Sequence, residues 1–290
     1  MSVEGFSLCR KFHVKHNGTL LDRTQTTCTI ETMVRVIAVA NQKGGVGKTT
    51  TAINLAACLA AYEFRTLIVD IDPQANATSG LGYDKDAMGE TIYDVLLEQT
   101  SVGSVLKKTE ISYLSLVPSN ISLVGAEVEL VGLGSRESRL KRALAPIRDS
   151  YDFIFIDCPP SLGLLTINGL VAADSVLIPI QCEYYALEGL GKLISTVRGV
   201  QKTFNTGLKI EGVLLTMFDS RLNLSKQVVE EARKYFKEKI YDTVIHRNVK
   251  LAEAPSFGKP IILYDILSKG ANDYMDLTRE IVNHAEESAG

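Results

Sequence analysis

The chain has 290 residues, a formal net charge of −3 and 46% hydrophobic residues, a balance typical of a globular protein with a large core. No apolar run approaches the roughly 20 residues needed to cross a bilayer, which excludes a helical membrane span. The slightly negative charge argues against a uniformly basic nucleic-acid binder, although a local basic face remains open. Five cysteines without a C-x-x-C pair fit reduced cytoplasmic thiols better than a disulfide or zinc framework.

Residues 1–32 differ in composition from the rest of the chain, being polar, rich in threonine near their end, and without helical or strand periodicity. Residues 12–16 (FHVKH) can be encoded by DNA that contains TTTCACGTGAAA, a perfect inverted repeat, which is unusual in coding DNA. We interpret residues 1–32 as a disordered extension or the product of a mis-assigned start codon, and residues 33–290 as the folded domain.

From Met33 onward, continuous apolar runs alternate with helical patterns. Such alternation is typical of a parallel sheet covered on both faces, whose ligands bind at the carboxyl ends of the strands. The sequence therefore predicts an α/β fold, a single domain with a doubly wound, mostly parallel sheet. Strands are expected at residues 34–40, 66–71, 114–117, 153–156, 175–180, 213–217 and 261–263, and helices at 91–98, 136–150, 187–204, 225–239 and 270–287.

A glycine-rich segment, NQKGGVGKTT at residues 41–50, separates the first apolar run from a helical pattern at residues 51–61. Strand, glycine-rich turn and helix is the context of a phosphate-binding loop, in which backbone N–H groups and the helix N-terminus face the phosphates. Lys48 can reach the β- and γ-phosphates, and the Thr49 hydroxyl can ligate Mg²⁺. A chance glycine-rich turn is the alternative, and two later motifs make it untenable.

This loop departs from the common G-x-x-x-x-G-K-[ST] pattern at two positions. Gln42 occupies the place of the first glycine, and a second lysine, Lys43, follows it.

Two aspartates end the second expected strand, which continues into Asp72 and Pro73. Asp70 and Asp72 lie on the same side because strand side chains alternate. Asp72, nearer the tip, is the candidate for positioning a nucleophilic water beside Mg²⁺, whereas Asp70 is better explained as a turn or helix cap.

The run at residues 153–156 (FIFI) ends in Asp157, followed by Cys158, Pro159 and Pro160. An apolar run closed by aspartate is weak evidence alone. Downstream of a phosphate loop it is a Walker B element, with Asp157 holding Mg²⁺ directly or through water.

The segment at residues 221–259 holds nine lysines and arginines against five acids, an excess of four positive charges. Such a patch would bind phosphates with an affinity that falls as salt rises. For Lys234, Lys237 and Lys239, a solvated helix face is an equally good explanation. No aromatic residues are interleaved in a way that would indicate base stacking.

The C-terminal helical pattern carries Tyr274, Leu277, Ile281 and Val282 on one face. Its other face is acidic on balance. A membrane anchor would carry lysine and arginine there, so the pattern favours a docking helix.

The loop with its extra lysine, VDIDPQAN at 69–76 and FIFIDCPPSLG at 153–163 together resemble the ParA/Soj family of chromosome and plasmid partition ATPases. IQCEYYALEGL at 180–190, EGVLLTMFDSR at 211–221 and NVKLAEAPSFGKPIILYD at 248–265 agree, so the resemblance covers Met33 to about Glu286.

This resemblance implies a SIMIBI-like P-loop NTPase with a deviant Walker A motif that uses ATP and Mg²⁺ and dimerises with ATP between the subunits. Lys43 would be the signature lysine that reaches the partner's phosphates, as an arginine finger does. Relatives usually carry Pro-Arg-Asn near the adenine, where this chain has His246, Arg247 and Asn248, so only the proline position differs. The implied residues are, for catalysis, Lys43, Lys48 and Asp72; for ATP binding, Lys43, Gly44, Gly45, Val46, Gly47, Lys48, Thr49, Thr50 and Asn248; and for the metal, Thr49, Asp72 and Asp157.

The same resemblance implies a cytoplasmic, nucleoid-associated homodimer that binds double-stranded DNA without sequence preference and does not bind membranes. Arg221 matches a DNA-contacting position, and so does Lys250, where relatives often carry an arginine with its bidentate fork. The implied partner is a ParB-type centromere-binding protein that stimulates hydrolysis, with a secondary role in replication initiation as a further expectation. The inverted repeat encoded near residue 12 resembles the core of a site for such a partner.

Two alternative classes share this ancestry. A membrane-positioning ATPase similar to MinD is disfavoured by the acidic C-terminal helix and by Gln42. A metallocluster reductase similar to the nitrogenase iron protein would use cysteines such as Cys158 and Cys182, which we interpret instead as small apolar neighbours of the site.

Overall fold

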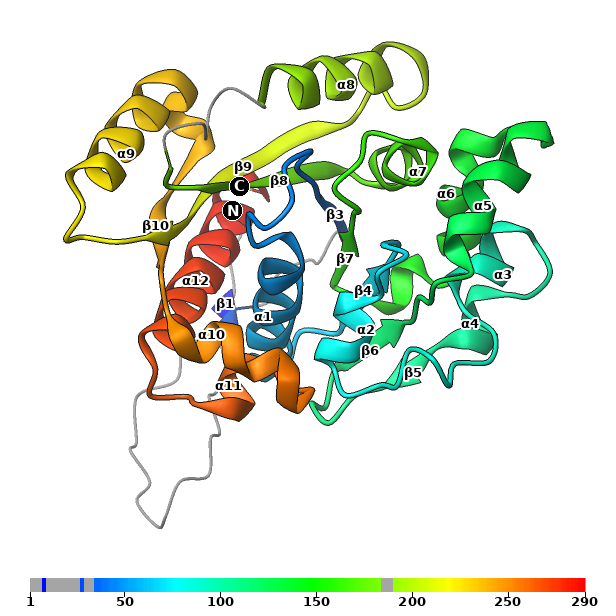
Figure 1. The fold of residues 1–290 in the computed structure, drawn as a ribbon, viewed down its shortest axis with the longest axis horizontal. Helices are drawn as coiled ribbons and strands as arrows, with labels where there is room; N and C mark the ends of the chain where they lie inside the picture. Colours follow the sequence, from blue (N-terminus) through cyan, green and yellow to red (C-terminus); the bar gives the residue numbers. More distant parts are fainter. Residues whose placement is uncertain (1–6, 9–26, 29–33, 184–189, 290) are drawn as a thin grey trace, which may run out of the picture.

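The computed structural model describes residues 7–8, 27–28, 34–183 and 190–289. An eight-stranded sheet with the order β10-β9-β8-β3-β7-β4-β6-β5 forms its centre (Figure 1), and only β5 runs antiparallel to its neighbour. This confirms the predicted doubly wound, mostly parallel α/β domain. The strands are β3 (Arg35–Val39), β4 (Thr66–Asp70), β5 (Lys107–Lys108), β6 (Leu114–Val117), β7 (Phe153–Asp157), β8 (Ser175–Gln181), β9 (Lys209–Phe218) and β10 (Ile240–His246).

Alternate residues of the buried strands point to opposite faces of the sheet and divide the core into two layers. In β3, Val36 and Ala38 pack into one layer, and Ile37 and Val39 into the other. The first layer is covered by α3 (Ile92–Leu96), α4 (Val102–Val105), α5 (Leu123–Glu129), α6 (Arg139–Leu144), α7 (Leu164–Ala172), α8 (Leu190–Thr203) and α9 (Asn223–Phe236). The second is covered by α1 (Lys48–Ala61), α2 (Asn76–Gly80), α10 (Val249–Glu253), α11 (Ile261–Tyr264) and α12 (Lys269–Ala289).

The strand predicted at residues 261–263 is wrong, because this segment forms the short helix α11. Pro260 fixes the backbone before the helix, and its carbonyl accepts hydrogen bonds from the N–H groups of Leu263 and Tyr264. The Asn54 side chain accepts the N–H of Ile261 at 2.7 Å. Three apolar residues were too few to distinguish a buried helical turn from a strand.

The outermost strand on the other side, β10, was not predicted. Its burial pattern mixes buried, half-buried and exposed positions, because it is an edge strand with only β9 beside it. The short antiparallel β5 at the opposite edge was missed for the same reason.

The helix predicted at residues 136–150 is broken. It consists of a 3-10 turn (Arg136–Ser138), α6, and a second 3-10 turn (Arg148–Ser150). Pro146 lies just after α6 and cannot donate a helical hydrogen bond. The helices predicted at 91–98, 187–204 and 225–239 correspond to α3, α8 and α9 within the described residues.

The C-terminal helix docks as predicted. Tyr274, Leu277 and Ile281 are fully buried, and α12 lies beside α1 and β10 (Figure 1). The Tyr274 hydroxyl lies 3.2 Å from the Thr51 hydroxyl of α1. No helix among the described residues is long and apolar enough to span a membrane.

The interpretation of residues 1–32 lies outside the described residues, apart from a short antiparallel pair, β1 (Ser7–Leu8) and β2 (Thr27–Cys28).

Candidate active site

The glycine-rich loop connects β3 to α1 at the carboxyl edge of the sheet. Gly45 and Gly47 have φ angles of 74° and 88°, which side chains with a Cβ rarely adopt. The N–H of Thr51 donates to the Gly47 carbonyl at 2.8 Å, so α1 begins directly after the loop. The loop therefore presents backbone N–H groups and a helix N-terminus to the same space, which suits a phosphate group.

Residues distant in the chain hold this loop in place. The buried Asn41 side chain donates to the Pro179 carbonyl at 2.7 Å and accepts the N–H of Lys43 at 3.0 Å. Thr216 of β9 donates its hydroxyl to the Val46 carbonyl at 2.8 Å. No local sequence signal identified these supports, because they come from β8 and β9.

Pro179 can occupy the middle of the central strand β8 because β3 pairs with β8 only as far as Leu177. Beyond that point β3 turns into the loop, so no ladder partner needs the N–H that proline lacks.

Lys48 is only 6% exposed, and its ammonium group donates to the Lys43 carbonyl at 3.2 Å. Burial lowers its pKa, and the nearby negative charges of Asp157 and Asp72 oppose this shift. The fold thus brings together Lys48, Asp72 and Asp157, as the sequence predicted for a nucleotide site.

Asp157 ends β7, in register with Val39 of β3 and Asp70 of β4. Its carboxylate is fully buried, and neither oxygen accepts a hydrogen bond in the described structure. Burial and then the charge of Asp70 raise its pKa well above the ordinary value, whereas the Thr49 side chain, close by but outside hydrogen-bond geometry, opposes the shift.

A buried carboxylate with two unpaired oxygens beside a hydroxyl is a ligand set that suits Mg²⁺. Asp157 and Thr49 are thus the residues that would hold this ion.

Asp70 and Asp72 differ in what occupies their carboxylates. Asp70 accepts hydrogen bonds from the Thr78 N–H at 2.9 Å, the Thr78 hydroxyl at 2.7 Å and the Asp72 N–H at 3.1 Å. Burial raises its pKa to about 6 despite these bonds. Its role is therefore to fix the turn after β4, as the sequence indicated.

Asp72 uses one oxygen, Oδ1, to accept the N–H of Gln74 at 2.9 Å. Its other oxygen makes no hydrogen bond among the described residues, which leaves it free for a water or ligand. Ser119, after β6, donates its hydroxyl to the Asp72 carbonyl at 2.9 Å and its N–H to the Thr78 hydroxyl at 2.9 Å. The sequence reasoning missed Ser119, although it follows the end of a predicted parallel strand.

Lys43 is half-exposed and points to a surface acid that the sequence reasoning also missed. Its ammonium group lies 3.8 Å from Glu183 Oε2, and Arg247 lies 3.5 Å from Glu183 Oε1. Both pairs are solvent-accessible and weak. Lys43 can therefore leave Glu183 at little cost in free energy.

Asn248 caps α10, because its side chain accepts the N–H groups of Lys250 at 2.8 Å and Leu251 at 3.3 Å. His246 donates its N–H to Asp273 Oδ2 at 2.8 Å, and its Nδ1 lies 3.0 Å from the same oxygen. A proline at this position, as in the related motif, would lack that N–H donor.

The two predicted DNA-binding residues lie at the surface near the carboxyl ends of β9 and β10. Arg221, with 84% of its side chain exposed, forms two hydrogen bonds with Asp219 at 2.9 and 2.7 Å. These bonds lower the Asp219 pKa to about 2. Lys250 pairs with Glu253 at 2.9 Å and lies over the Tyr264 ring.

Cys58, Cys158 and Cys182 are buried free thiols. Burial raises the pKa of Cys58 and of Cys182 to about 12, and also raises that of Cys158. No group of three or more His, Cys, Asp or Glu side chains in the described part of the chain is arranged to hold a metal by itself. The interpretation of Cys158 and Cys182 as small packing residues fits this burial.

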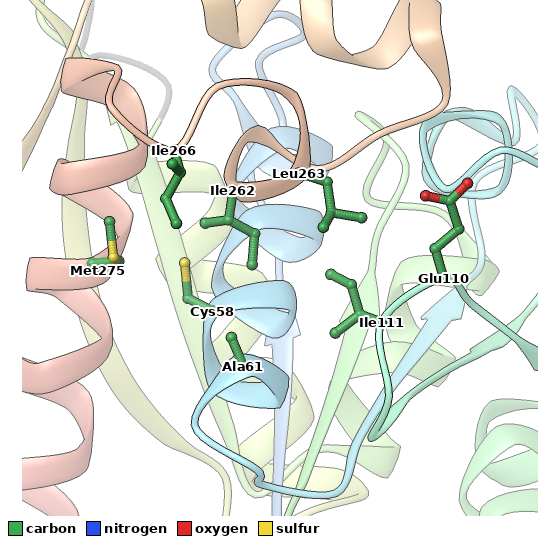
Figure 2. A pocket seen from close by; sticks show the side chains of 8 residues that line it. All are labelled: Cys58, Ala61, Glu110, Ile111, Ile262, Leu263, Ile266 and Met275. Atoms are coloured by element: carbon green, nitrogen blue, oxygen red, sulfur yellow. The ribbon is translucent and has the colours of Figure 1, made fainter. Parts of the chain in front are cut away.

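A separate apolar cavity of about 190 Å³ lies between α1, α11, α12 and the turn before β6 (Figure 2). Its lining is almost entirely apolar, and the carboxylate of Glu110 lies to one side. It offers no donors for phosphates and is not the nucleotide site. Its lining residues are Cys58, Ala61, Glu110, Ile111, Ile262, Leu263, Ile266 and Met275.

Comparison with known proteins agrees with this geometry. The AAA domain family matches residues 34–210. The chain is 61% identical over 249 residues to the sporulation initiation inhibitor protein Soj of Bacillus subtilis, covering 86% of this chain and 98% of Soj. It is 59% identical over 251 residues to the chromosome partitioning protein ParA of Myxococcus xanthus, covering 87% and 89%.

Among solved structures, a cobyrinic acid a,c-diamide synthase from Mycobacterium smegmatis with bound ADP and magnesium is 38% identical, with a TM-score of 0.79 over 88% of this chain and 97% of that one. The phosphate loop, the buried Asp157 and the identity to Soj and ParA lead to one conclusion: this chain belongs to the Soj/ParA family of chromosome-partitioning P-loop ATPases.

Proposed function

We propose that this protein is an ATP-dependent switch for DNA segregation, which dimerises with ATP and Mg²⁺, binds DNA as a dimer and releases it after hydrolysis. The observation that carries the ATPase part is the buried, unpaired carboxylate of Asp157 beside Lys48 and the glycine-rich loop. Such a carboxylate costs free energy unless a cation offsets it. A phosphate-bound Mg²⁺ is the cation that suits this loop.

Each residue has a task in this proposal. The loop N–H groups and the Lys48 ammonium bind the phosphate oxygens and offset their charge. The free oxygen of Asp72 orients the attacking water, and the Asp70–Thr78–Ser119 hydrogen bonds keep Asp72 in position. Thr49 and Asp157 hold Mg²⁺, which supplies charge neutralisation when bound.

An exposed apolar stripe supports a homodimer that covers this edge of the domain. Ile121, Val124, Val128 and Val131 recur at helical spacing along α5 and the turn after it, and all four are more than half exposed. Glu127 of the same helix lies against Gly163, in the loop that follows Asp157. The stripe therefore borders the nucleotide site, where Lys43 would reach the partner's phosphates.

Replacing Val128, which is 75% exposed, with glutamate is expected to weaken the ATP-dependent dimer at least tenfold, because a charge would be buried without a partner. Sedimentation velocity with Mg²⁺ and a slowly hydrolysed ATP analogue measures the effect. Leu267→Glu, at a residue 83% exposed beyond α11, is the matched control and should dimerise normally. Equal dimerisation of both variants would remove the stripe from the interface.

We further propose that the dimer binds double-stranded DNA without sequence preference through Arg221 and Lys250. Both are exposed, and their ion pairs with Asp219 and Glu253 involve groups at the surface. Phosphate oxygens can replace these acids with little loss of free energy. A ParB-type protein would stimulate hydrolysis, and the protein would act on the nucleoid in the cytoplasm.

The test is retention of a DNA fragment with ATP, with ADP and without nucleotide, on the wild type and Arg221→Ala. We expect retention only with ATP, and a loss of about tenfold in the variant, in line with a salt-dependent phosphate contact of about 1–3 kcal/mol. Equal retention in the three nucleotide states would contradict the switch. Full binding by Arg221→Ala would remove this residue from the DNA site.

An amide-forming activity, suggested by the name of the solved relative from Mycobacterium smegmatis, is not favoured here. A cysteine that releases ammonia from glutamine must be an accessible thiolate. The three described cysteines are buried, and burial raises their pKa values.

A further inference from the structure

One helix of the domain, α8, carries only positive charge. Its residues Leu190–Thr203 include Lys192, Arg198 and Lys202 and no acid. All three cations are exposed. None of them forms an ion pair or a hydrogen bond with a described residue, whereas Arg221, Arg247 and Lys250 each have an acidic partner.

The packing of α8 fixes which face these cations share. Leu190, Leu193, Val197 and Val200 are buried at the spacing of a single helical stripe. The opposite side of the helix therefore faces solvent along its whole length. From Lys192 to Lys202 this face extends for about 15 Å, at 1.5 Å per residue.

The surface between the cations is unusually low. Gly191 and Gly199 lie on the exposed side of α8, and a Cβ at either position would meet nothing within 4 Å. Each glycine costs about 1 kcal/mol relative to alanine in a helix. Packing inside this chain gives no reason for them, but they leave the cations standing above a flat backbone.

The position of α8 connects it to the proposed DNA site. It joins β8 to β9 and packs in the same core layer as α9, so both helices cover one face of the sheet (Figure 1). Its first turn lies toward the carboxyl edge, where β9 ends shortly before Arg221. The exposed cations of α8 therefore continue the basic surface away from that edge.

We propose that the outer face of α8 is a second DNA-contacting surface, on which Lys192, Arg198 and Lys202 bind the phosphate backbone of double-stranded DNA. This rests on the proposed DNA-binding function and extends it to a helix outside the segment at residues 221–259. Charge complementarity selects the ligand, because an acid-free face with three unpaired cations suits a polyanion. Contacts of this kind position DNA and carry no sequence information.

The test measures DNA affinity of the ATP-bound full-length protein as a function of salt. The variant replaces Lys192, Arg198 and Lys202 with glutamine, which keeps helix propensity and removes the charges. Each lost phosphate contact should make the slope of log affinity against log salt less negative by about 0.9. We expect the slope to fall by about two to three such steps and the affinity to fall at least tenfold at low salt.

The matched control replaces Lys107, Lys108 and Lys141 with glutamine, which removes the same charge near the opposite edge of the sheet. This control should keep the wild-type slope, and both variants should keep the unstimulated ATPase rate and the melting temperature. If the α8 variant melts early, the milder pair Lys192→Gln and Lys202→Gln takes its place, with an expected loss of about two slope steps.

The outcomes separate the two proposals. A wild type that fails to bind DNA with ATP overturns the proposed function itself. A wild type that binds, with an α8 variant indistinguishable from the control triple, overturns only the role of α8 and leaves the helix for another polyanion. An affinity loss without a change in slope also overturns it, because phosphate contacts require that change.

Discussion

Replacing Lys48 with alanine is expected to lower ATP hydrolysis about 10²- to 10³-fold, the effect of removing one preorganised donor from a reacting group. The side chain is buried beside Asp72 and Asp157, and alanine would leave these carboxylates without their nearby cation. Phosphate release at saturating ATP measures the rate, and binding of a fluorescent ATP analogue measures the site. An unchanged rate would show that the glycine-rich loop is not the nucleotide site.

The matched comparison is Lys43→Ala. Lys43 is half-exposed and forms only a long ion pair with Glu183. Under the proposal, this variant keeps nucleotide binding by the monomer but loses the ATP-dependent dimer and stimulated hydrolysis. Loss of nucleotide binding in Lys43→Ala, with dimerisation kept in Lys48→Ala, would reverse the two assignments.

Replacing Asp157 with asparagine is expected to abolish Mg²⁺-dependent hydrolysis and to stabilise the nucleotide-free protein. The carboxylate is buried with both oxygens unpaired, so its charged form costs folding free energy. Asparagine has nearly the same shape and no charge. The gain should be about 1–3 kcal/mol, measured by urea unfolding at neutral pH without nucleotide.

This variant also has a pH signature. Burial raises the pKa of Asp157 well above 3.8, and raises that of Asp70 to about 6. For an acid with a raised pKa, the folded state binds more protons than the unfolded state, so stability is highest below pH 4 and is lost as pH rises through the folded pKa. Asp157→Asn should lose its part of this decline and keep the part due to Asp70.

The control for this experiment is Asp70→Ala, which removes the acceptor of three hydrogen bonds from Thr78 and Asp72. It should destabilise the protein by about 1–3 kcal/mol. A wild type and an Asp157→Asn variant of equal stability at neutral pH would mean that the carboxylate is not strained without its cation.

Much of the site could be predicted from the sequence because its parts are local. The glycine-rich loop, Asp72 and Asp157 each stand directly after a continuous apolar run, and such runs form parallel strands whose carboxyl ends meet at one edge. Within each motif, the spacing along the chain sets the geometry. The fold class and the main buried strands followed from the same runs.

The segments predicted wrongly or missed lack that local signal. Residues 261–263 have the composition of a strand, but Asn54 and Pro260 organise them as the helix α11. The edge strand β10 has too mixed a pattern to be recognised, since only one neighbour pairs with it. In both cases tertiary partners outweighed local preference.

The sequence by itself determined which residues bear the chemistry: Lys48 and Asp157 were identifiable because their motifs are contiguous. Only the tertiary structure decided what surrounds them. Thr216 holds the loop from β9, Ser119 holds Asp72 from β6, and Glu183 lies between Lys43 and Arg247. The reason is that sequence periodicity specifies which face of an element is buried, whereas contacts across a parallel sheet depend on strand order and register.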